Sequence, residues 1–330
     1  MLNLVKMFAV IAAAIVMSLP VYADKVKVGF VYVGPTGDHG WTYRHDIGRQ
    51  DVEAHFGDQV ETFYVESVSE GPDAERVINS MVLKGADIIF TTSFGYMEAT
   101  LKMANRYPDV KFEHATGYKQ AANMSSYGLR LYQARHVQGV IAGLMTQTDK
   151  ICYIASYPIP EVIREINTYF MGARSMNPNV EMDIVWVNTW YDPGKESDAA
   201  KVLMAQGCDM VAQHGFGQAS DQIAFAPDAQ LTATIDNWSP YYIRKVGGVI
   251  DGTWKSEDYF GHMNEGVVMM APFTNMPDDV RTKAADIMQQ ISDGAYFAFT
   301  GPIKDQNGEI RIPEGHVATD VELNTMDYYV

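Results

Sequence analysis

Cysteine is scarce in this 330-residue sequence, which contains only Cys152 and Cys208. The two residues are far apart and form no CxxC motif, so a cysteine-based zinc or redox site is not expected. Each of them stands at the start of a predicted strand. We expect two small buried thiols, while an exported protein is also free to join them in a disulfide.

Basic residues are outnumbered, since 25 Lys and Arg face 41 Asp and Glu and the formal net charge is −16. Nucleic-acid binding depends on Lys and Arg that neutralise phosphates, so this balance argues against a nucleic-acid partner. It argues equally against an anionic membrane surface. A small ligand in a polar pocket stays compatible with the charge.

Long hydrophobic runs are missing after the N-terminus. The first residues combine a basic position at Lys6, an apolar stretch over residues 7–19 and the small-residue pattern Val21-Tyr22-Ala23. This pattern predicts a signal peptide over residues 1–23, cleaved after Ala23. The apolar stretch is shorter than the ~20 residues of a membrane span, and no cysteine near the cleavage site offers a lipid anchor. We therefore expect a periplasmic protein without a membrane anchor.

Motifs of catalysis and cofactor binding are absent: there is no Walker loop, GxSxG elbow or HExxH motif. Residues 215–220 only partly match GxGxxG, because Ser220 replaces the third glycine and Pro227 interrupts any following helix. We therefore expect no cofactor and no catalytic group.

Metal ligands and acid–base pairs are not expected either. The histidines lack the short paired spacing of zinc ligands; they are His39, His45, His55 and His114 among others. The acidic residues are expected mostly on solvated faces; they include Asp38, Glu66, Glu70, Glu113, Glu161 and Glu165.

The most informative segment that is present covers residues 86–118. An apolar strand at Ile88–Phe90 ends in Thr91-Thr92-Ser93, a helix-spaced stretch follows, and a second strand ends in His114-Ala115-Thr116-Gly117. In an open parallel sheet the carboxyl ends of strands line the ligand crevice. This segment therefore predicts both an α/β fold and one wall of a binding site.

Strands and helices alternate in two consecutive series, which favours two lobes with parallel sheets over one large sheet. The first series has strands at 26–32, 60–65, 88–90, 110–112 and 127–132 and helices at 41–56 and 73–83. The second has helices at 134–146, 160–176 and 195–206 and strands at 150–155, 182–187 and 209–213.

Three tryptophans follow predicted strand ends. Trp41 comes after the glycine-rich loop of the first strand, Trp190 stands with Asp192 after the strand ending at Val187, and Trp238 follows a later strand. An aromatic ring at such a position can lie flat on a planar or sugar ligand. Packing in the core explains each tryptophan equally well when it is taken singly.

Several segments resemble the basic membrane protein (BMP) family of substrate-binding proteins of ABC importers. They are YPDVKFEHATGY (107–118), VQGVIAGLMTQTDKICYIASYPIPEVI (137–163) and NTWYDPGKESDAAKVLMAQGCDMVAQH (188–214), followed by GTWKSEDYFG and FTGPIKDQNGEI. The resemblance implies a type I periplasmic-binding-protein fold, with two Rossmann-like lobes and a hinge. It also implies a monomer without catalysis that delivers its ligand to an ABC permease. The lobes then comprise residues 24–131 plus 237–259 and residues 132–236 plus 260–330, connected near Leu131, Asn237 and Phe260.

The resemblance also implies a site for a purine base or nucleoside. In the family an Asn that reads the base follows an aromatic residue, so Trp41 matches the aromatic residue and Thr42 replaces the Asn. Thr116 stands where the nucleoside receptors carry an Asp. These departures favour a free purine base or a related heterocycle. The expected ligand-binding residues are Trp41, Thr42, Ser93, Phe94, Tyr96, Thr116, Trp190, Asp192, Asp221 and Trp238.

One crossover helix and strand that the family usually carries are missing between His214 and Gly215. This shortening affects the second lobe and its ligand contacts, including Asp221. A receptor for another small solute, such as a sugar or signalling molecule, remains an alternative, because type I lobes bind many ligands. An exported α/β enzyme is the alternative of a different class.

Overall fold

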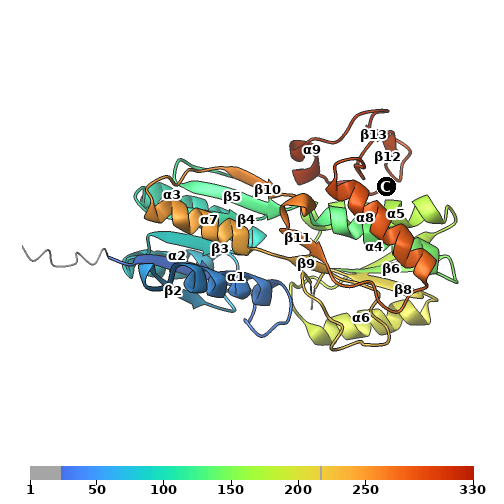
Figure 1. Ribbon diagram of the computed structural model, residues 1–330, viewed down its shortest axis with the longest axis horizontal. Helices are drawn as coiled ribbons and strands as arrows, with labels where there is room; N and C mark the ends of the chain where they lie inside the picture. Colours follow the sequence, from blue (N-terminus) through green and yellow to red (C-terminus); the bar gives the residue numbers. More distant parts are fainter. Residues whose placement is uncertain (1–23, 216–217) are drawn as a thin grey trace, which may run out of the picture.

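The computed structural model describes residues 24–215 and 218–330. In it two groups of strands and helices lie one beyond the other along the long axis (Figure 1). The expected signal peptide, residues 1–23, lies outside the described residues. Within the described ranges, no helix has the length and the apolar composition that crossing a bilayer requires.

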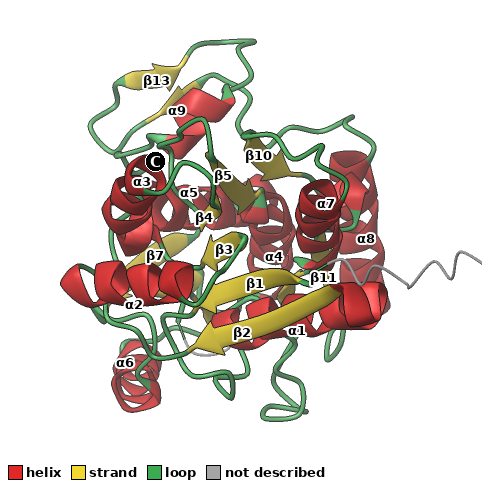
Figure 2. Cartoon of the chain, turned by 90° about the vertical axis from the view of Figure 1, so that its left-hand side faces the viewer, coloured by secondary structure: helices red, strands yellow, loops and turns green. Residues whose placement is uncertain are grey.

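The N-terminal lobe is built on a six-stranded parallel sheet of order β10-β5-β4-β3-β1-β2. Helices α2 and α3 cover one face of this sheet and α1 and α7 the other (Figure 2). The strands are β1 Val26–Val31, β2 Val60–Val65, β3 Ile88–Thr91, β4 Lys111–Ala115, β5 Met124–Leu129 and β10 Asp258–Gly261. The helices are α1 Trp41–Phe56, α2 Pro72–Leu83, α3 Met97–Arg106 and α7 Ser239–Ile250, with short 3₁₀ turns η1 Gly57–Gln59 and η2 Phe94–Tyr96.

Alternate residues of the central strands fill two separate cores because successive side chains of a strand point to opposite faces. Phe30 and Phe90 stack with ring centroids 4.8 Å apart and pack toward α7. Val31 and Ile89, which are the sequence neighbours of Phe30 and Phe90, pack among α2 and α3. The central strands are therefore apolar on both faces, as a buried parallel sheet requires.

The C-terminal lobe contains a three-stranded parallel sheet of order β7-β6-β8. Its strands are β6 Lys150–Ala155, β7 Glu181–Trp186 and β8 Met210–Gln213, and its helices are α4 Leu131–Met145, α5 Pro160–Met176, α6 Pro193–Ala205 and α8 Asp278–Ser292. Two antiparallel ladders complete the chain: β9 Thr234–Asp236 pairs with β11 Val268–Met270, and β12 Ile303–Lys304 pairs with β13 Ile310–Ile312. The 3₁₀ turn η3 Met263–Glu265 lies between β10 and β11, and the short helix α9 Asp320–Asn324 follows β13.

The connection from β8 to β9 is irregular. None of its described residues, 214–215 and 218–233, lies in a helix or a strand. This is where the sequence lacks the expected crossover. The described sheet of the C-terminal lobe accordingly has β8 at its edge.

Helices α4 and α5 pack unusually closely. A Cβ atom added to Gly139 would stand 2.0 Å from the carbonyl oxygen of Tyr169, and one added to Gly172 would stand 2.3 Å from the carbonyl oxygen of His136. No side chain fits at either position, so glycine permits the two backbones to meet. This close packing places α5 and its acidic residues firmly against α4.

Cys152 and Cys208 are joined in a disulfide, with their Cα atoms 6.0 Å apart. The expectation of two free thiols was therefore wrong. Strand β8 pairs in parallel with β6. This pairing brings Cys208, just before β8, close to Cys152 in β6. Both residues are buried beneath α6.

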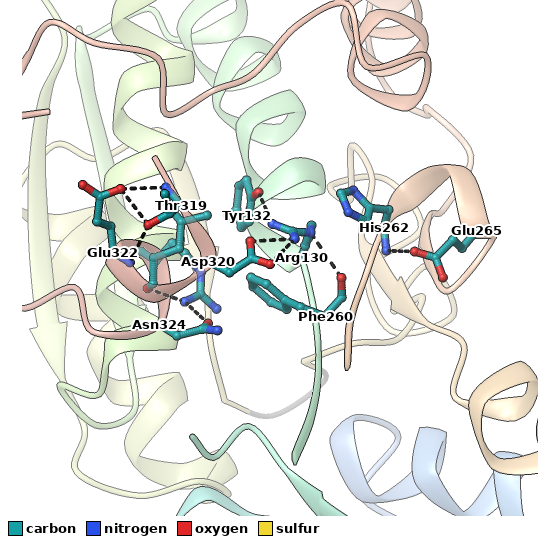
Figure 3. A network of polar contacts seen from close by, with 11 residues as sticks. Arg130, Tyr132, Phe260, His262, Glu265, Thr319, Asp320, Glu322 and Asn324 are labelled. Atoms are coloured by element: carbon teal, nitrogen blue, oxygen red, sulfur yellow. Dashed lines mark hydrogen bonds and ion pairs between the residues drawn. The ribbon is translucent and has the colours of Figure 1, made fainter. Parts of the chain in front are cut away.

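The C-terminal segment is bound to the connection between the lobes (Figure 3). Arg130, which links β5 to α4, donates to the carbonyl oxygen of Phe260 at 3.2 Å and to Asp320 at 2.8 Å. Arg164 of α5 donates to the carbonyl oxygen of Leu323 at 2.6 Å. Helix α9 is thereby held to residues at which the chain passes from one sheet to the other.

Candidate functional site

A cavity of about 360 Å³ lies between the two lobes, at the carboxyl ends of both parallel sheets. Each of six strands contributes a following residue to its wall: Trp41 after β1, Ser93 after β3, Thr116 after β4, Tyr157 after β6, Trp190 after β7 and His214 after β8. Ligands of open α/β sheets bind at this edge. The volume lies within the range of small-molecule sites, which begins near ~300 Å³.

Aromatic side chains form much of the wall; they are Trp41, Phe94, Tyr157, Trp190 and Tyr191. Trp41 donates its indole N–H to the carbonyl oxygen of Thr92 at 2.7 Å and meets Trp238 edge-on, with centroids 5.5 Å apart. Across the cavity, Trp190 packs against Tyr157 at 4.9 Å. Rings held in this way offer rigid faces to a flat ligand.

Asp38 shapes the loop that carries Trp41. Its carboxylate accepts hydrogen bonds from the backbone N–H groups of Gly40, Thr42 and Tyr43 at 2.8 to 3.0 Å. A carboxylate that satisfies free N–H groups at a helix start stabilises that start. Asp38 is only 4 % exposed, so its expected place on a solvated face was wrong.

Thr116 adopts the left-handed conformation, with φ of 62°. A β-branched residue rarely occupies this region, and such outliers concentrate at functional sites. The N–H of Thr116 donates to the carbonyl oxygen of Tyr127 at 2.7 Å, which holds the strained turn in place. The residue consequently stands at the cavity wall.

A cluster of charged side chains lies at the end of the cavity that the C-terminal lobe forms. Glu161 and Glu165 lie one turn apart on α5, and His214 follows β8. Glu165 accepts from Arg135 at 2.7 Å and lies 3.6 Å from Nε2 of His214. The Nδ1 atom of His214 is 3.2 Å from the hydroxyl oxygen of Ser156.

The two carboxyl groups of this cluster differ in pKa because their charged neighbours differ. Burial and the neighbouring charge of Glu165 raise the pKa of Glu161 to about 7. Burial also opposes ionisation of Glu165, but His214 and Arg135 outweigh it and lower the pKa of Glu165 to about 2. One acid is thus held ionised while its neighbour changes charge near neutral pH.

The expectation that these acids are solvated was wrong for Glu161, Glu165 and Glu113, which are all buried. Glu113 has Lys245 at 3.1 Å and accepts from Tyr241 at 2.6 Å, so its charge is balanced inside the lobe. Buried charges occur where such partners exist. The partners come from other elements of the chain, and acid spacing alone does not reveal them.

Six of the residues expected from the sequence line the cavity; they are Trp41, Thr42, Ser93, Phe94, Thr116 and Trp190. The other four lie outside its wall. Tyr96 is fully buried and donates to the carbonyl oxygen of Val68, and Trp238 stacks on His45 at 4.5 Å in the core. Asp192 caps α6 through the N–H of Lys195, and Asp221 is an exposed residue that accepts from Gln230.

Sequence reasoning missed several wall residues, namely Glu70, Tyr157, Glu161, His214 and Gln218. The carboxyl-end rule that pointed to His114 applies equally to His214, because that residue directly follows β8. The i, i+4 spacing of Glu161 and Glu165, which places both acids on one face of the helix, was a second available signal.

The chemistry of the cavity is that of a binding site with aromatic faces and one polar end. Glu161, Glu165 and His214 each direct one oxygen or nitrogen atom to the same place, and these atoms lie within 4.8 Å of one another. Arg135 already pairs with Glu165. The positive charge of its guanidinium group disfavours a cation at the same place.

Comparison with known proteins identifies relatives that match most of the chain. Residues 25–220 match the Bmp family, described as ABC transporter substrate-binding protein PnrA-like. The chain is 51% identical to the purine-binding protein of Brucella abortus (strain 2308), over 93% of this chain and 92% of that protein. It is 35% identical to a protein of Haloferax volcanii named as an ABC transporter glucose-binding protein, over 82% of this chain and 73% of that one.

Solved structures share the fold. An ABC transporter solute-binding protein from Aeropyrum pernix K1 superposes with a TM-score of 0.73 at 17% identity, over 86% of this chain and 95% of that one. A transcriptional activator of the comK gene from Bacillus halodurans superposes with a TM-score of 0.68 at 23% identity, over 82% and 99%. The architecture is that of periplasmic-binding-type proteins, with parallel sheets in two lobes.

Proposed function

This chain belongs to the PnrA-like Bmp family of ABC transporter substrate-binding proteins, and we propose that it captures a purine base or nucleoside for import. Proteins of this kind bind a small ligand and deliver it to a permease. The ligand would lie in the cavity between the lobes, in the periplasm, after removal of the signal peptide. The chain would act as a monomer and would release its ligand unchanged.

The observation that carries the proposal is the pairing of flat aromatic walls with a hydrogen-bonding end. Trp41 and Trp190 stand on different lobes, while Glu161 and His214 lie at one end of the same cavity. A purine has two aromatic faces and an edge of donors and acceptors, so it matches both features at once. The 51% identity to a purine-binding protein supports the same ligand class.

A ligand panel measured by thermal unfolding and calorimetry tests the proposal. Adenine, guanine, hypoxanthine, adenosine and glucose are the probes, and a ligand at about 100 times its Kd should add about 2.7 kcal/mol to the free energy of unfolding. We expect purines to stabilise the protein. Glucose is included because the Haloferax relative is named for it, and stabilisation by glucose alone contradicts the proposal.

Chromatography of a nucleoside incubated with the pure protein tests release without turnover. We expect the nucleoside to be recovered intact. Appearance of free base in proportion to protein concentration would support the enzyme alternative instead.

A further inference from the structure

Glu161 is a buried acid without a partner. It stands in the first turn of α5, directly after Pro160, and only 9 % of the residue is exposed. Its side chain lies in the cavity wall, and among residues 24–215 and 218–330 it has no hydrogen-bond or ion-pair partner. An unpaired buried carboxyl group is costly, so a bound ligand is the natural source of its missing hydrogen bonds.

Five titratable groups face Glu161, and none of them forms a hydrogen bond or an ion pair with it. They are Glu165 and Arg164 on α5, Arg135 on α4, His214 after β8 and Asp236 on β9. Arg135 binds Glu165, and Arg164 donates to the C-terminal segment at Leu323. These groups set the local field, and atoms of Glu165 and His214 lie within 4.8 Å of the Glu161 carboxyl group without hydrogen-bonding to it.

Gln218 provides a fixed polar neighbour in the same wall. Its side-chain oxygen accepts from Arg135, which fixes the direction of the amide. Its amide nitrogen is buried and has no hydrogen-bond partner among the described residues. The wall thus presents an acid and an amide donor that both lack partners.

Building on the proposed function, we infer that Glu161 is the specificity-determining residue of the site and reads the hydrogen-bonding edge of the purine. In its neutral form it pairs with a 6-aminopurine such as adenine. In its ionised form it pairs with guanine. The ratio of adenine to guanine binding therefore depends on the protonation state of this one carboxyl group.

The pairing follows from the donors and acceptors of each form. A neutral carboxyl group donates its O–H to a ring nitrogen of adenine and accepts from the 6-amino group. A carboxylate only accepts, so it suits the N1–H and 2-amino donors of guanine and repels the ring nitrogen lone pair of adenine. Burial and Glu165 bring the pKa of Glu161 to about 7, so both forms are populated near neutral pH.

Titration calorimetry with adenine and guanine at about pH 5.5 and about pH 8.5 tests this inference. For the unaltered protein we expect the adenine-to-guanine affinity ratio to fall by roughly five- to 150-fold between the two pH values, because a bidentate pair discriminates by about 1–3 kcal/mol. Failure of every purine to bind at either pH contradicts the proposed function itself. Purine binding with a constant ratio overturns only the role of Glu161.

The Glu161→Gln variant separates this carboxyl group from its titrating neighbours. Gln keeps one donor and one acceptor, the pair that suits adenine, at every pH. We expect it to bind adenine equally at both pH values and to lose roughly five- to 150-fold in guanine affinity. Glu181→Gln, at an exposed residue of β7 in the same lobe, is the matched control and should behave like the unaltered protein. A pH-dependent ratio that persists in Glu161→Gln assigns the effect to another group and overturns the inference.

A bound cation is the competing use of the same residues. Repeating the titrations with EDTA and with added Zn²⁺ distinguishes the two. Equal purine affinities under both conditions support the inference, whereas purine binding that requires the metal overturns it.

Discussion

The indole N–H of Trp190, in the C-terminal lobe, donates to the carboxylate of Glu70 in the N-terminal lobe at 3.2 Å. The same carboxylate oxygen accepts from the hydroxyl of Ser93 at 2.6 Å. Trp190 and Ser93 both stand in the cavity wall. Glu70 therefore connects a strand end of one lobe to an aromatic wall of the other, at the place where the lobes meet.

Replacing Glu70 by Ala should weaken purine binding by about threefold to tenfold, because the hydrogen bonds of a charged acceptor are lost while solvent still reaches the site. Calorimetry measures the change, and stopped-flow kinetics should show it mainly as faster dissociation. Glu61→Ala, at an exposed position of β2, serves as the control. Equal affinities for the two variants would show that the bridge between the lobes does not contribute to holding the ligand.

Replacing Trp41 by Ala should cost roughly five- to 150-fold in purine affinity, since stacking of a base on an aromatic ring contributes about 1–3 kcal/mol. Tyr43→Ala removes an exposed ring two residues further along the same helix and should leave the affinity unchanged. Calorimetry compares the two. A Trp41→Ala protein that is folded and binds a purine as tightly as before removes this residue from the site.

Reducing the disulfide between Cys152 and Cys208 should lower the free energy of unfolding by about 2–4 kcal/mol, because the bond restricts the unfolded chain over a separation of 56 residues. Denaturant unfolding with and without a reductant measures the loss. The double variant Cys152→Ala, Cys208→Ala is the control, and its stability should not respond to reductant. Detection of two free thiols in the purified protein by mass spectrometry would contradict the pairing.

Acidification should destabilise the protein in part through His45. This residue is fully buried with Nδ1 at 2.5 Å from the hydroxyl of Tyr242, and burial, aided by Arg44, places its pKa well below the ordinary value. Above about pH 6.5 both the folded and the unfolded forms carry a neutral ring, so nothing is lost. Below that pH only the unfolded form gains a proton, and stability should fall by up to about 1.4 kcal/mol per pH unit for this group.

Denaturant unfolding of His45→Gln as a function of pH checks this expectation. The variant should show a shallower loss of stability on acidification than the unaltered protein, whatever its stability at neutral pH. His55→Gln, at an exposed residue of the same helix, should keep the original slope. Identical slopes in all three proteins would place the acid sensitivity elsewhere, for instance at the buried His114 or His136.

Some features of the site were predictable because they depend on local pattern. Trp41, Ser93 and Thr116 follow predicted strands, and parallel strands end at one edge of a sheet. Residues that depend on distant partners were not predictable in the same way. Tyr96 and Trp238 stand near strand ends too, but the packing of α3 and α7 turns them into the core.

The amino-acid sequence by itself determined the α/β class, the two-lobed architecture, the likeness to a transport family and the edge at which a ligand would bind. These follow from hydrophobic periodicity and turn residues, which are local properties of the chain. Only the tertiary structure decided that Glu161, His214 and Gln218 meet in one wall and that Glu70 reaches Trp190. Those contacts join residues far apart in sequence, so they depend on strand order, on the close packing of α4 with α5 and on the approach of the two lobes.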